Sequence, residues 1–404
     1  MALLLVLGTT AGTAPLVWTY TAGNYSWAVA ISGDGQYAIA GSDDMRAYFF
    51  DTKSTSGKPL WSYQMRGYVR HVAISKNGAR TAVSDTDGGV LFFDTPNVGA
   101  DPTWSHRSGS AVETLVMSED GHYLVAGDRQ GTISVFKTDL TNPLVWQYVI
   151  PGGITAVSLS KSGSLVATAT QGGLYFFDHV SAASSYVWVF DKDTSFPYAA
   201  LSDNASYVVA GGDDGYVYLV SGSGRLMDRQ RLGGAVSALS VSYATGLVVS
   251  GSTSGNLSLY SIGNRLGRLD SLDTRRPITS AVISENGERI SVGNLDGIVS
   301  TFDRSFAGLM WTYDTGAIVH SLSLSGSGQV TAAVSDTGGI YLFDEALMQA
   351  NPTISWEMPT LAAAVILVVT ITIAVCSIRH RRGRRVAARE DLSASMKMYN
   401  GELQ

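Results

Sequence analysis

The feature that most constrains this chain is a short pattern that recurs along most of its length. It first runs from Ala28 to Gly41 and ends at Tyr48-Phe49-Phe50-Asp51. An apolar stretch closed by Ser is followed by a Gly turn, a second apolar stretch, a polar turn and a third apolar stretch. Successive marker serines stand 40 to 43 residues apart. They are Ser32, Ser75, Ser118, Ser160, Ser202, Ser242, Ser284 and Ser325, which gives eight copies of one unit.

Each copy predicts β-strands. The residues one and three places before every marker serine are apolar, and those two places before are small or β-branched, as expected when alternate residues of a strand face opposite sides. Tryptophans mark a fourth strand at six junctions between copies: Trp18, Trp61, Trp104, Trp146, Trp188 and Trp311. Two junctions, near 226–232 and 266–272, lack this Trp. A period of about 40–45 residues with four strands per unit predicts an all-β fold, an eight-bladed β-propeller of four-stranded antiparallel blades.

The repeats occupy residues 15–358, and both ends of this range offer a strand that closes the ring. Val17–Tyr20 and Ile354–Met358 each fit the Trp-type strand, although only one is needed. We expect the N-terminal strand to close the propeller. Residues 1–14 form a short apolar segment that reads either as the end of a secretory signal peptide or as a packing N-terminal tail.

A second apolar segment, within 359–378, predicts one C-terminal transmembrane helix. Residues 360–378 carry no charge over 19 residues, close to the roughly 20 that span a bilayer. The basic cluster that follows is Arg379, Arg381, Arg382, Arg384 and Arg385. Positive charge beside a span favours the cytoplasmic side, so we expect the propeller outside a cell membrane and the tail, 379–404, inside. This cluster would also attract anionic lipid headgroups.

Composition excludes several classes of function. The formal net charge is −6 and no basic stripe runs through the repeats, so nucleic acid is not an expected partner. The single cysteine, Cys376, lies within the predicted span, which leaves neither a disulfide framework nor a cysteine metal site. The five histidines of the repeats, His71, His106, His122, His179 and His320, are spread along the chain without ligand spacing. We therefore expect no enzyme activity, no metal and no cofactor.

One ring of positions breaks the uniformity of the repeats. The residues five places before each marker serine, where the innermost strand begins, are Trp27, Arg70, Glu113, Thr155, Pro197, Ser237, Thr279 and His320. His71 and Tyr198 stand one step further into the strand. Varied polar and aromatic groups on a rigid platform favour a binding face. The predicted site for a protein or a surface glycan is Trp27, Arg70, His71, Glu113, Tyr198 and His320; ordinary variation at loop ends, with Arg70 and Glu113 forming a surface salt bridge, is the alternative.

Three Asn-x-Ser triplets begin at Asn24, Asn204 and Asn256, and each is a glycosylation acceptor if the propeller is exported. We expect Asn24 in a loop, Asn204 in a turn and Asn256 at the start of a strand. Asn24 is the preferred candidate for that reason.

The repeats resemble two known families. The Phe-Asp endings, such as Phe50-Asp51 and Phe343-Asp344, and the Ser-x-Asp-Gly turn at Ser32–Gly35 resemble WD-repeat propellers. The junction from Asp51 to Trp61 is similar to that of pyrroloquinoline-quinone-type propellers, which commonly have eight blades. The Gly-His dipeptide of WD repeats is absent, and no quinone ligand set or calcium site matches residue by residue.

These features favour a membrane-anchored, non-catalytic binding or scaffold module displayed outside the cell. Two alternatives remain open at this point. One is an exported oxidoreductase of the quinone-propeller type, and the other is a cytosolic WD-repeat scaffold anchored by its tail.

Overall fold

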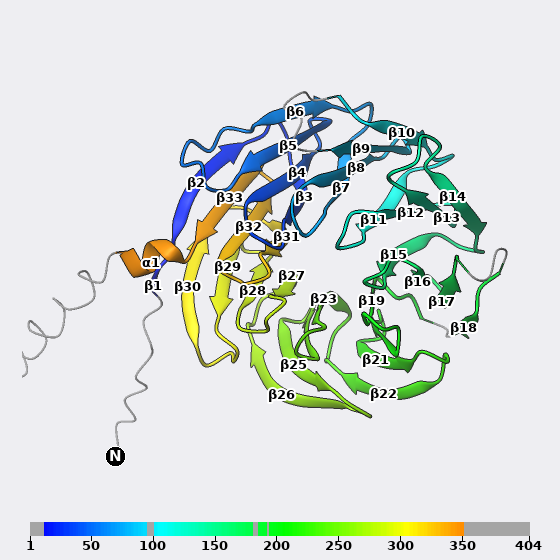
Figure 1. The fold of residues 1–404 in the computed structure, drawn as a ribbon. Coiled ribbons are helices and arrows are strands. Elements are labelled where there is room, and N and C mark those ends of the chain that lie inside the picture. Colours follow the sequence, from blue (N-terminus) through cyan, green and yellow to red (C-terminus); the bar gives the residue numbers. More distant parts are fainter. Residues whose placement is uncertain (1–11, 95–100, 181–184, 192–193, 351–404) are drawn as a thin grey trace, which may run out of the picture. The chain divides into compact units, whose positions relative to one another are not determined.

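Eight antiparallel sheets arranged in a ring make up the protein (Figure 1). The computed structural model describes residues 12–94, 101–180, 185–191 and 194–350. The chain divides into two compact units, residues 1–346 and 347–404, and the sheets belong to the first. Each innermost strand contacts the innermost strands of both neighbouring blades, and β3 contacts β31, which closes the ring. The predicted eight-bladed propeller is confirmed.

The first four blades follow one another along the chain. Their strands are β3 (Ser26–Ile31), β4 (Tyr37–Ser42), β5 (Arg46–Asp51) and β6 (Trp61–Gln64) in blade 1; β7 (Val69–Ile74), β8 (Arg80–Asp85), β9 (Gly89–Asp94) and β10 (Trp104–Arg107) in blade 2; β11 (Val112–Met117), β12 (Tyr123–Asp128), β13 (Thr132–Lys137) and β14 (Leu144–Val149) in blade 3; β15 (Ile154–Leu159), β16 (Leu165–Thr170), β17 (Gly173–Asp178) and β18 (Trp188–Asp191) in blade 4.

The last four blades complete the ring. Their strands are β19 (Tyr198–Leu201), β20 (Tyr207–Gly211), β21 (Tyr216–Ser221) and β22 (Leu226–Arg231) in blade 5; β23 (Val236–Ser242), β24 (Leu247–Ser252), β25 (Asn256–Ile262) and β26 (Leu266–Asp273) in blade 6; β27 (Ile278–Ile283), β28 (Ile290–Asn294), β29 (Ile298–Phe302) and β30 (Leu309–Asp314) in blade 7; β31 (Val319–Leu324), β32 (Val330–Ser335), β33 (Gly339–Asp344) and β2 (Leu16–Thr21) in blade 8. A short helix, α1 (Ala346–Ala350), follows β33.

The N-terminal strand closes the propeller, as predicted. β2 pairs antiparallel with β33, with Thr19 opposite Tyr341 and Thr21 opposite Gly339. The competing strand, 354–358, lies outside the described residues. One feature was not predicted: β1 (Gly12–Thr13) pairs in parallel with β30 as a fifth strand on the outer edge of blade 7.

The predicted membrane segment is not tested by the described part of the chain. Among the described residues, no helix has both the length and the apolar character that crossing a bilayer requires. The span at 359–378, the basic cluster after it and residues 1–11 all lie outside the described residues. The anchor and its orientation therefore stay predictions.

The marker serine recurs because its side chain closes the first hairpin of the blade. All eight marker serines are buried. In blade 1, Ser32 Oγ accepts the N–H of Tyr37 at 3.0 Å and donates to Asp34 at 2.5 Å. The N–H five residues on makes the same bond to the marker in every blade except blade 6, where Ser242 Oγ instead donates to the Glu285 carbonyl of blade 7. A buried hairpin end needs such a partner for its backbone groups.

The tryptophans of the outer strands hold neighbouring blades together. Trp18, Trp61, Trp104, Trp146 and Trp311 each pack on the Phe that ends the third strand of the next blade, with ring centroids 4.8 to 5.2 Å apart. Trp188 instead donates its indole N–H to the Gly222 carbonyl of blade 5. Aromatic pairs at this spacing add to the stabilisation that burial provides. The repeated Trp and Phe-Asp of the sequence are therefore the two halves of one contact between blades.

An aspartate stands in the Trp register at the two junctions that lack a tryptophan. Asp228 lies opposite Leu219 and Asp270 opposite Leu259, the places that Trp occupies in the other blades. Asp228 Oδ2 accepts the N–H of Leu266 at 2.9 Å, and Asp270 Oδ2 accepts the N–H of Phe306 at 2.8 Å. These junctions replace ring packing with a hydrogen bond to the next blade.

Asp228→Ala should lower the free energy of unfolding by about 1–3 kcal/mol, because the buried Leu266 N–H loses its acceptor. Asp228→Asn retains a side-chain oxygen in the same place and should cost clearly less. Urea unfolding of the two variants beside the wild type measures the difference. Equal losses for Ala and Asn would contradict this account of the junction.

Candidate functional site

The predicted ring of varied residues lies where the innermost strands are irregular. We call the face on which these strands begin the rim face, and the opposite one the hairpin face. Seven of the eight innermost strands have a register shift at the ring residue, for example between Ser26 and Ala28, which leaves Trp27 without a partner on β4. Pro197 is the exception and precedes β19. A β-bulge redirects a side chain away from the regular alternation of the sheet.

Hydroxyl groups of the ring tie blades 4 to 8 together. Thr155 Oγ1 donates to the Phe196 carbonyl at 2.6 Å, Ser237 Oγ to the Ile278 carbonyl at 2.5 Å, and Thr279 Oγ1 to the Val319 carbonyl at 2.5 Å. Tyr198 Oη donates to the Ser237 carbonyl at 2.5 Å. Each bond runs to the start of the next innermost strand. In blades 4 to 7 these hydroxyl groups therefore serve the scaffold, and Tyr198, a predicted binding residue, is one of them.

Blades 8, 1 and 2 carry a stacked cluster instead. His320 stacks on Trp27 with ring centroids 3.9 Å apart, and the Arg70 guanidinium carbon lies 3.9 Å from the Trp27 ring centroid. Asp43 fixes the cluster through polar contacts with two of its members. It accepts the Trp27 indole N–H at 2.9 Å, and its two oxygens each lie 3.0 Å from a nitrogen of Arg70. Side chains locked in this way form a preorganised platform.

The proposed salt bridge between Arg70 and Glu113 is wrong. Arg70 pairs with Asp43, and Glu113 pairs with Arg129 of its own blade at 2.6 Å. Both partners, Asp43 and Arg129, are the first residues of the turn between the second and third strands. Sequence reasoning missed this position, although its acidic or basic character in several copies could have indicated it.

Two predicted site histidines are neutral at pH 7. Burial lowers the pKa of His71 to about 4, and the neighbouring Arg70 acts in the same direction. Burial also lowers the pKa of His320; Asp336 and Asp43 oppose this shift, and Arg70 adds to it. Neither imidazole therefore supplies positive charge to the rim face.

Exposed large side chains lie in the loops next to this cluster, and the Tyr68 ring centroid is 6.0 Å from the Arg70 guanidinium carbon. Tyr25 and Tyr68, in the loops that lead into blades 1 and 2, are 50% and 45% exposed, and Met45 is also exposed. The carbonyls of Tyr25 and Tyr68 accept N–H groups from the adjacent turns, which fixes both loops. Exposed tyrosines on an ordered backbone are typical of energetically important contact residues in protein interfaces.

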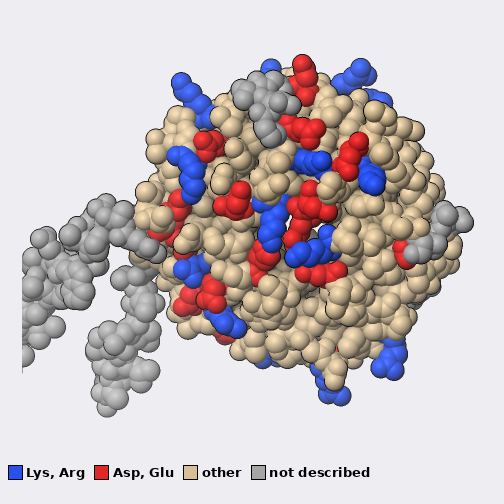
Figure 2. All heavy atoms as spheres, in the orientation of Figure 1, with Lys and Arg blue, Asp and Glu red and all other residues tan. Residues whose placement is uncertain are grey.

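The hairpin face carries a charge lattice that sequence reasoning did not single out. Lys76 Nζ lies 2.5 Å from Glu285 of blade 7 and 3.5 Å from Glu119 of blade 3, which also meets Lys161. The hydrogen bond to Glu285 raises the pKa of Lys76, while burial opposes it. Figure 2 shows acidic and basic side chains gathered round the central opening. These residues directly follow the marker serines and border a cavity of about 470 Å³.

Glycines make this lattice possible. A Cβ atom at Gly33 would lie 2.6 Å from Lys76 Cγ, and one at Gly326 would lie 3.0 Å from Glu285 Oε2. Blades 8 and 1 therefore carry no side chain where Lys76 crosses to Glu285. The lattice consists of paired charges that connect blades 2, 3, 4 and 7, and we interpret it as a structural link between them.

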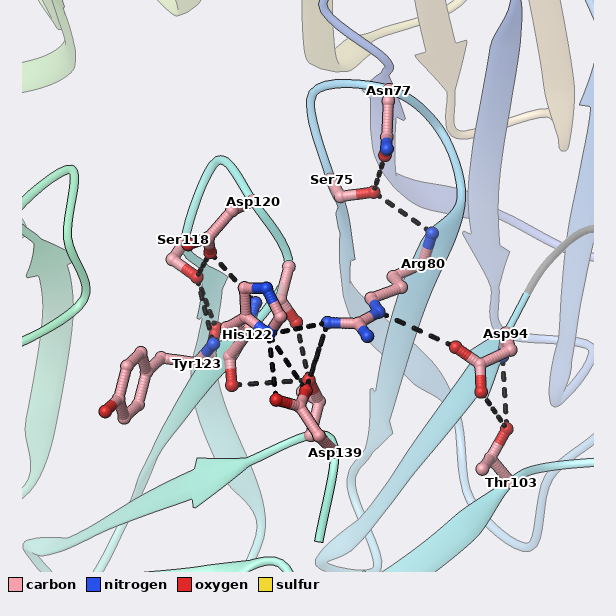
Figure 3. A network of polar contacts seen from close by, with 12 residues as sticks. Ser75, Asn77, Arg80, Asp94, Thr103, Ser118, Asp120, His122, Tyr123 and Asp139 are labelled. Carbon is pink, nitrogen blue, oxygen red and sulfur yellow. Dashed lines mark hydrogen bonds and ion pairs between the residues drawn. The ribbon is translucent and has the colours of Figure 1, made fainter.

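A second polar network joins blades 2 and 3 on the same face (Figure 3). Arg80 lies between Asp94, at 3.6 Å, and Asp139, at 3.2 Å, and His122 Nδ1 lies 2.9 Å from Asp139. Burial acts to raise the pKa of Asp139, but His122, Thr138 and Arg80 together lower it. Exposed ion pairs of this kind add little stability.

The glycosylation triplets lie where the sequence predicts. Asn24 is exposed in the loop before β3, Asn204 is exposed in a turn, and Asn256 begins β25. Their modification stays a prediction. Across the described residues, no group of three or more His, Cys, Asp or Glu side chains is placed to hold a metal ion.

Comparison with known proteins supports the fold. Residues 15–51 match the WD40 family, described as WD domain, G-beta repeat. No curated protein matches the chain. The solved structure of Sqt1 from Chaetomium thermophilum, bound to the N-terminus of the ribosomal protein L10, is 17% identical, with a TM-score of 0.71 over 82% of this chain and 100% of that one. The C-terminal WD40 domain of Sif2 is 13% identical, with a TM-score of 0.71 over 83% and 99% of the two chains.

Fold and repeat together define the class: the protein is an eight-bladed β-propeller. Within this class, residues 15–51 match the model of the WD40 repeat. At these identities the solved structures establish the fold alone. The resemblance of the junctions to quinone-type propellers stays a prediction.

Proposed function

We propose that the protein is a non-catalytic module that binds a protein partner on its rim face, over blades 8, 1 and 2. The observation that carries this proposal is the division of the ring. In blades 4 to 7, hydroxyl groups at or next to the ring bond to the following blade, whereas Trp27, Arg70 and His320 form a rigid aromatic and charged platform. Exposed Tyr25 and Tyr68 lie beside it. Large contact groups on a locked backbone cost little entropy to order on binding.

The comparisons support this proposal at the level of class. The similar Sqt1 propeller is described as bound to the N-terminus of the ribosomal protein L10, so a related ring holds a polypeptide segment. A surface glycan is the second candidate ligand, because a Trp beside polar groups also suits a sugar. We give preference to a protein because both exposed tyrosines lie beside the platform.

Photo-crosslinking tests the rim-face site directly. Tyr68 is replaced by benzoyl-phenylalanine in the full-length protein in its own cells, and Tyr186, an exposed tyrosine in blade 4, is replaced in the same way as a matched control. We expect protein adducts from position 68 and few from position 186. Tyr25→Ala in the position-68 protein should reduce the adduct about tenfold or more, as for loss of a major contact residue. Adducts from position 186 alone would contradict the proposal.

We further propose that residues 359–378 anchor the propeller to a membrane, with the propeller outside and the tail inside. The support is the uncharged stretch and the arginine cluster after it. Protease treatment of intact cells, with a tag at each end of the chain, should remove the propeller and leave the C-terminal tag protected. Protection of the propeller would instead favour a cytosolic scaffold anchored by its tail.

A further inference from the structure

A cavity of about 420 Å³ lies between blades 1 and 2, where the loop from Met65 to Tyr68 leads into β7. Its walls come from the end of β6 and this loop on one side, and from β9 and β10 on the other. Arg66 lines it two residues before the exposed Tyr68, and Arg107 lines it from the end of β10. Its volume is within the range of pockets that bind ligands. The proposed binding face therefore has a recess next to one of its contact tyrosines.

The backbone on both sides of Arg66 is held in place. The N–H of Met65 bonds to a carbonyl of blade 1 at 2.7 Å, and the N–H of Gly67 bonds to Asp85 Oδ2 at 3.2 Å. A Cβ atom at Gly67 would lie 2.8 Å from the backbone nitrogen of Asp87, so the loop lies directly on the turn of blade 2. Arg66 therefore reaches the cavity from a fixed point of the backbone.

The positive charge of Arg66 is not neutralised within the molecule. Among the described residues, its guanidinium has no hydrogen bond or ion pair. Of the described residues that line the cavity, only Asp85 is acidic, and it is buried. Its two oxygens accept three backbone N–H groups at 2.7 to 3.2 Å, which stabilise its charge. Asp85 therefore does not need Arg66 as a partner.

Arg107 adds a second guanidinium that is only weakly engaged. It lies 3.4 Å from Asp87, and both side chains are about half exposed, at 51% and 53%. An exposed ion pair of this kind adds little stability, and a guanidinium has five N–H donors to share. His106, also in the wall, is neutral at pH 7 because burial lowers its pKa. The cavity thus offers two guanidinium groups to a new acceptor.

We propose that this cavity binds an acidic side chain, aspartate or glutamate, of the protein partner. The inference rests on the proposed function and specifies the chemistry of its ligand. The carboxylate meets Arg66 and Arg107 at the rim end of the cavity, and its aliphatic stem packs on the half-buried Tyr63 and Leu91. Charge-assisted bonds between guanidinium and carboxylate are short, strong and often paired. A basic side chain would instead be repelled by two arginines.

The test starts from the full-length protein that carries benzoyl-phenylalanine at position 68. Mass spectrometry of the adduct identifies the partner and its crosslinked segment, and the partner is then purified with each acidic residue of that segment replaced singly by its amide. One replacement should weaken binding to the unlabelled wild-type protein about tenfold. With Arg66→Gln the same replacement should have little further effect, because the two charges form one interaction. Arg225→Gln, at an exposed Arg just before β22 in blade 5, is the matched control and should keep the tenfold difference.

The possible failures are distinguishable. If position 68 crosslinks a partner but no acidic replacement weakens binding, or if the tenfold loss persists with Arg66→Gln, the acidic subsite is excluded and the proposed function stands. If position 68 yields no adduct, both are excluded. Thermal unfolding of Arg66→Gln, expected at the wild-type midpoint because the side chain is exposed, shows that an altered result reflects the charge rather than the fold.

Discussion

Replacing Trp311 by alanine is expected to lower the free energy of unfolding by about 3–5 kcal/mol, the range for removal of a large aromatic side chain from a core. Trp311 is 0% exposed in β30 of blade 7. Its ring centroid lies 4.8 Å from that of Phe343 in blade 8, and its indole N–H donates to Glu345 at 3.4 Å. Truncation removes the stack and leaves a cavity between blades 7 and 8.

The adjacent residue provides the control for this variant. Thr312 follows Trp311 in β30, and its side chain is exposed, so Thr312→Ala should change stability by less than about 0.5 kcal/mol. Denaturant unfolding measures both variants, and hydrogen exchange should show faster opening at the boundary of blades 7 and 8 in Trp311→Ala. A loss similar to that of Thr312→Ala would mean that the Trp–Phe contact does not hold the blades together.

Acidification should destabilise the protein through His71. The pKa of His71 is lowered to about 4 in the folded protein, below its ordinary value of 6.5, mainly by burial. The unfolded chain therefore binds this proton more readily than the folded one. The contribution of neutral His71 is fully present above about pH 6.5 and is lost as the pH falls towards 4. The loss amounts to at most about 3 kcal/mol, because one unit of pKa corresponds to about 1.4 kcal/mol.

His71→Gln removes the titrating group and should flatten this part of the pH profile. Unfolding of the wild type and the variant is compared at pH 7 and at pH 4.5, and the wild type should lose up to about 3 kcal/mol more. His122→Gln serves as control, since the His122 side chain is 46% exposed on the hairpin face. Parallel pH profiles for wild type and His71→Gln would exclude His71 as the cause.

Several features of the fold could be predicted because they arise within one repeat. The marker serine closes a hairpin with residues two and five places further on, so its spacing reports the number of blades. The closing strand, Val17–Tyr20, carries a Trp at the same place as the outermost strands of other blades. The position of the varied ring also follows from counting five residues back from each marker serine. The β-bulges at those residues explain why their side chains depart from the alternation of the strand.

The partners within the site could not be predicted in this way. The alternative reading of the ring paired Arg70 with Glu113, the ring residue of the next blade, but Arg70 pairs with Asp43 of the preceding blade. The crossing of Lys76 to Glu285, over 200 residues apart in the chain, depends on glycines in two intervening blades.

The sequence by itself determined the eight units, their four strands, the closing strand and the ring on which the site stands, because strand alternation and hairpin closure are local and repeat with the chain. Only the tertiary structure decided which ring residues form hydrogen bonds between blades and which form the platform at Trp27. The physical reason is that closure of the ring brings together side chains from different copies, and bulges and missing side chains decide where those side chains can reach.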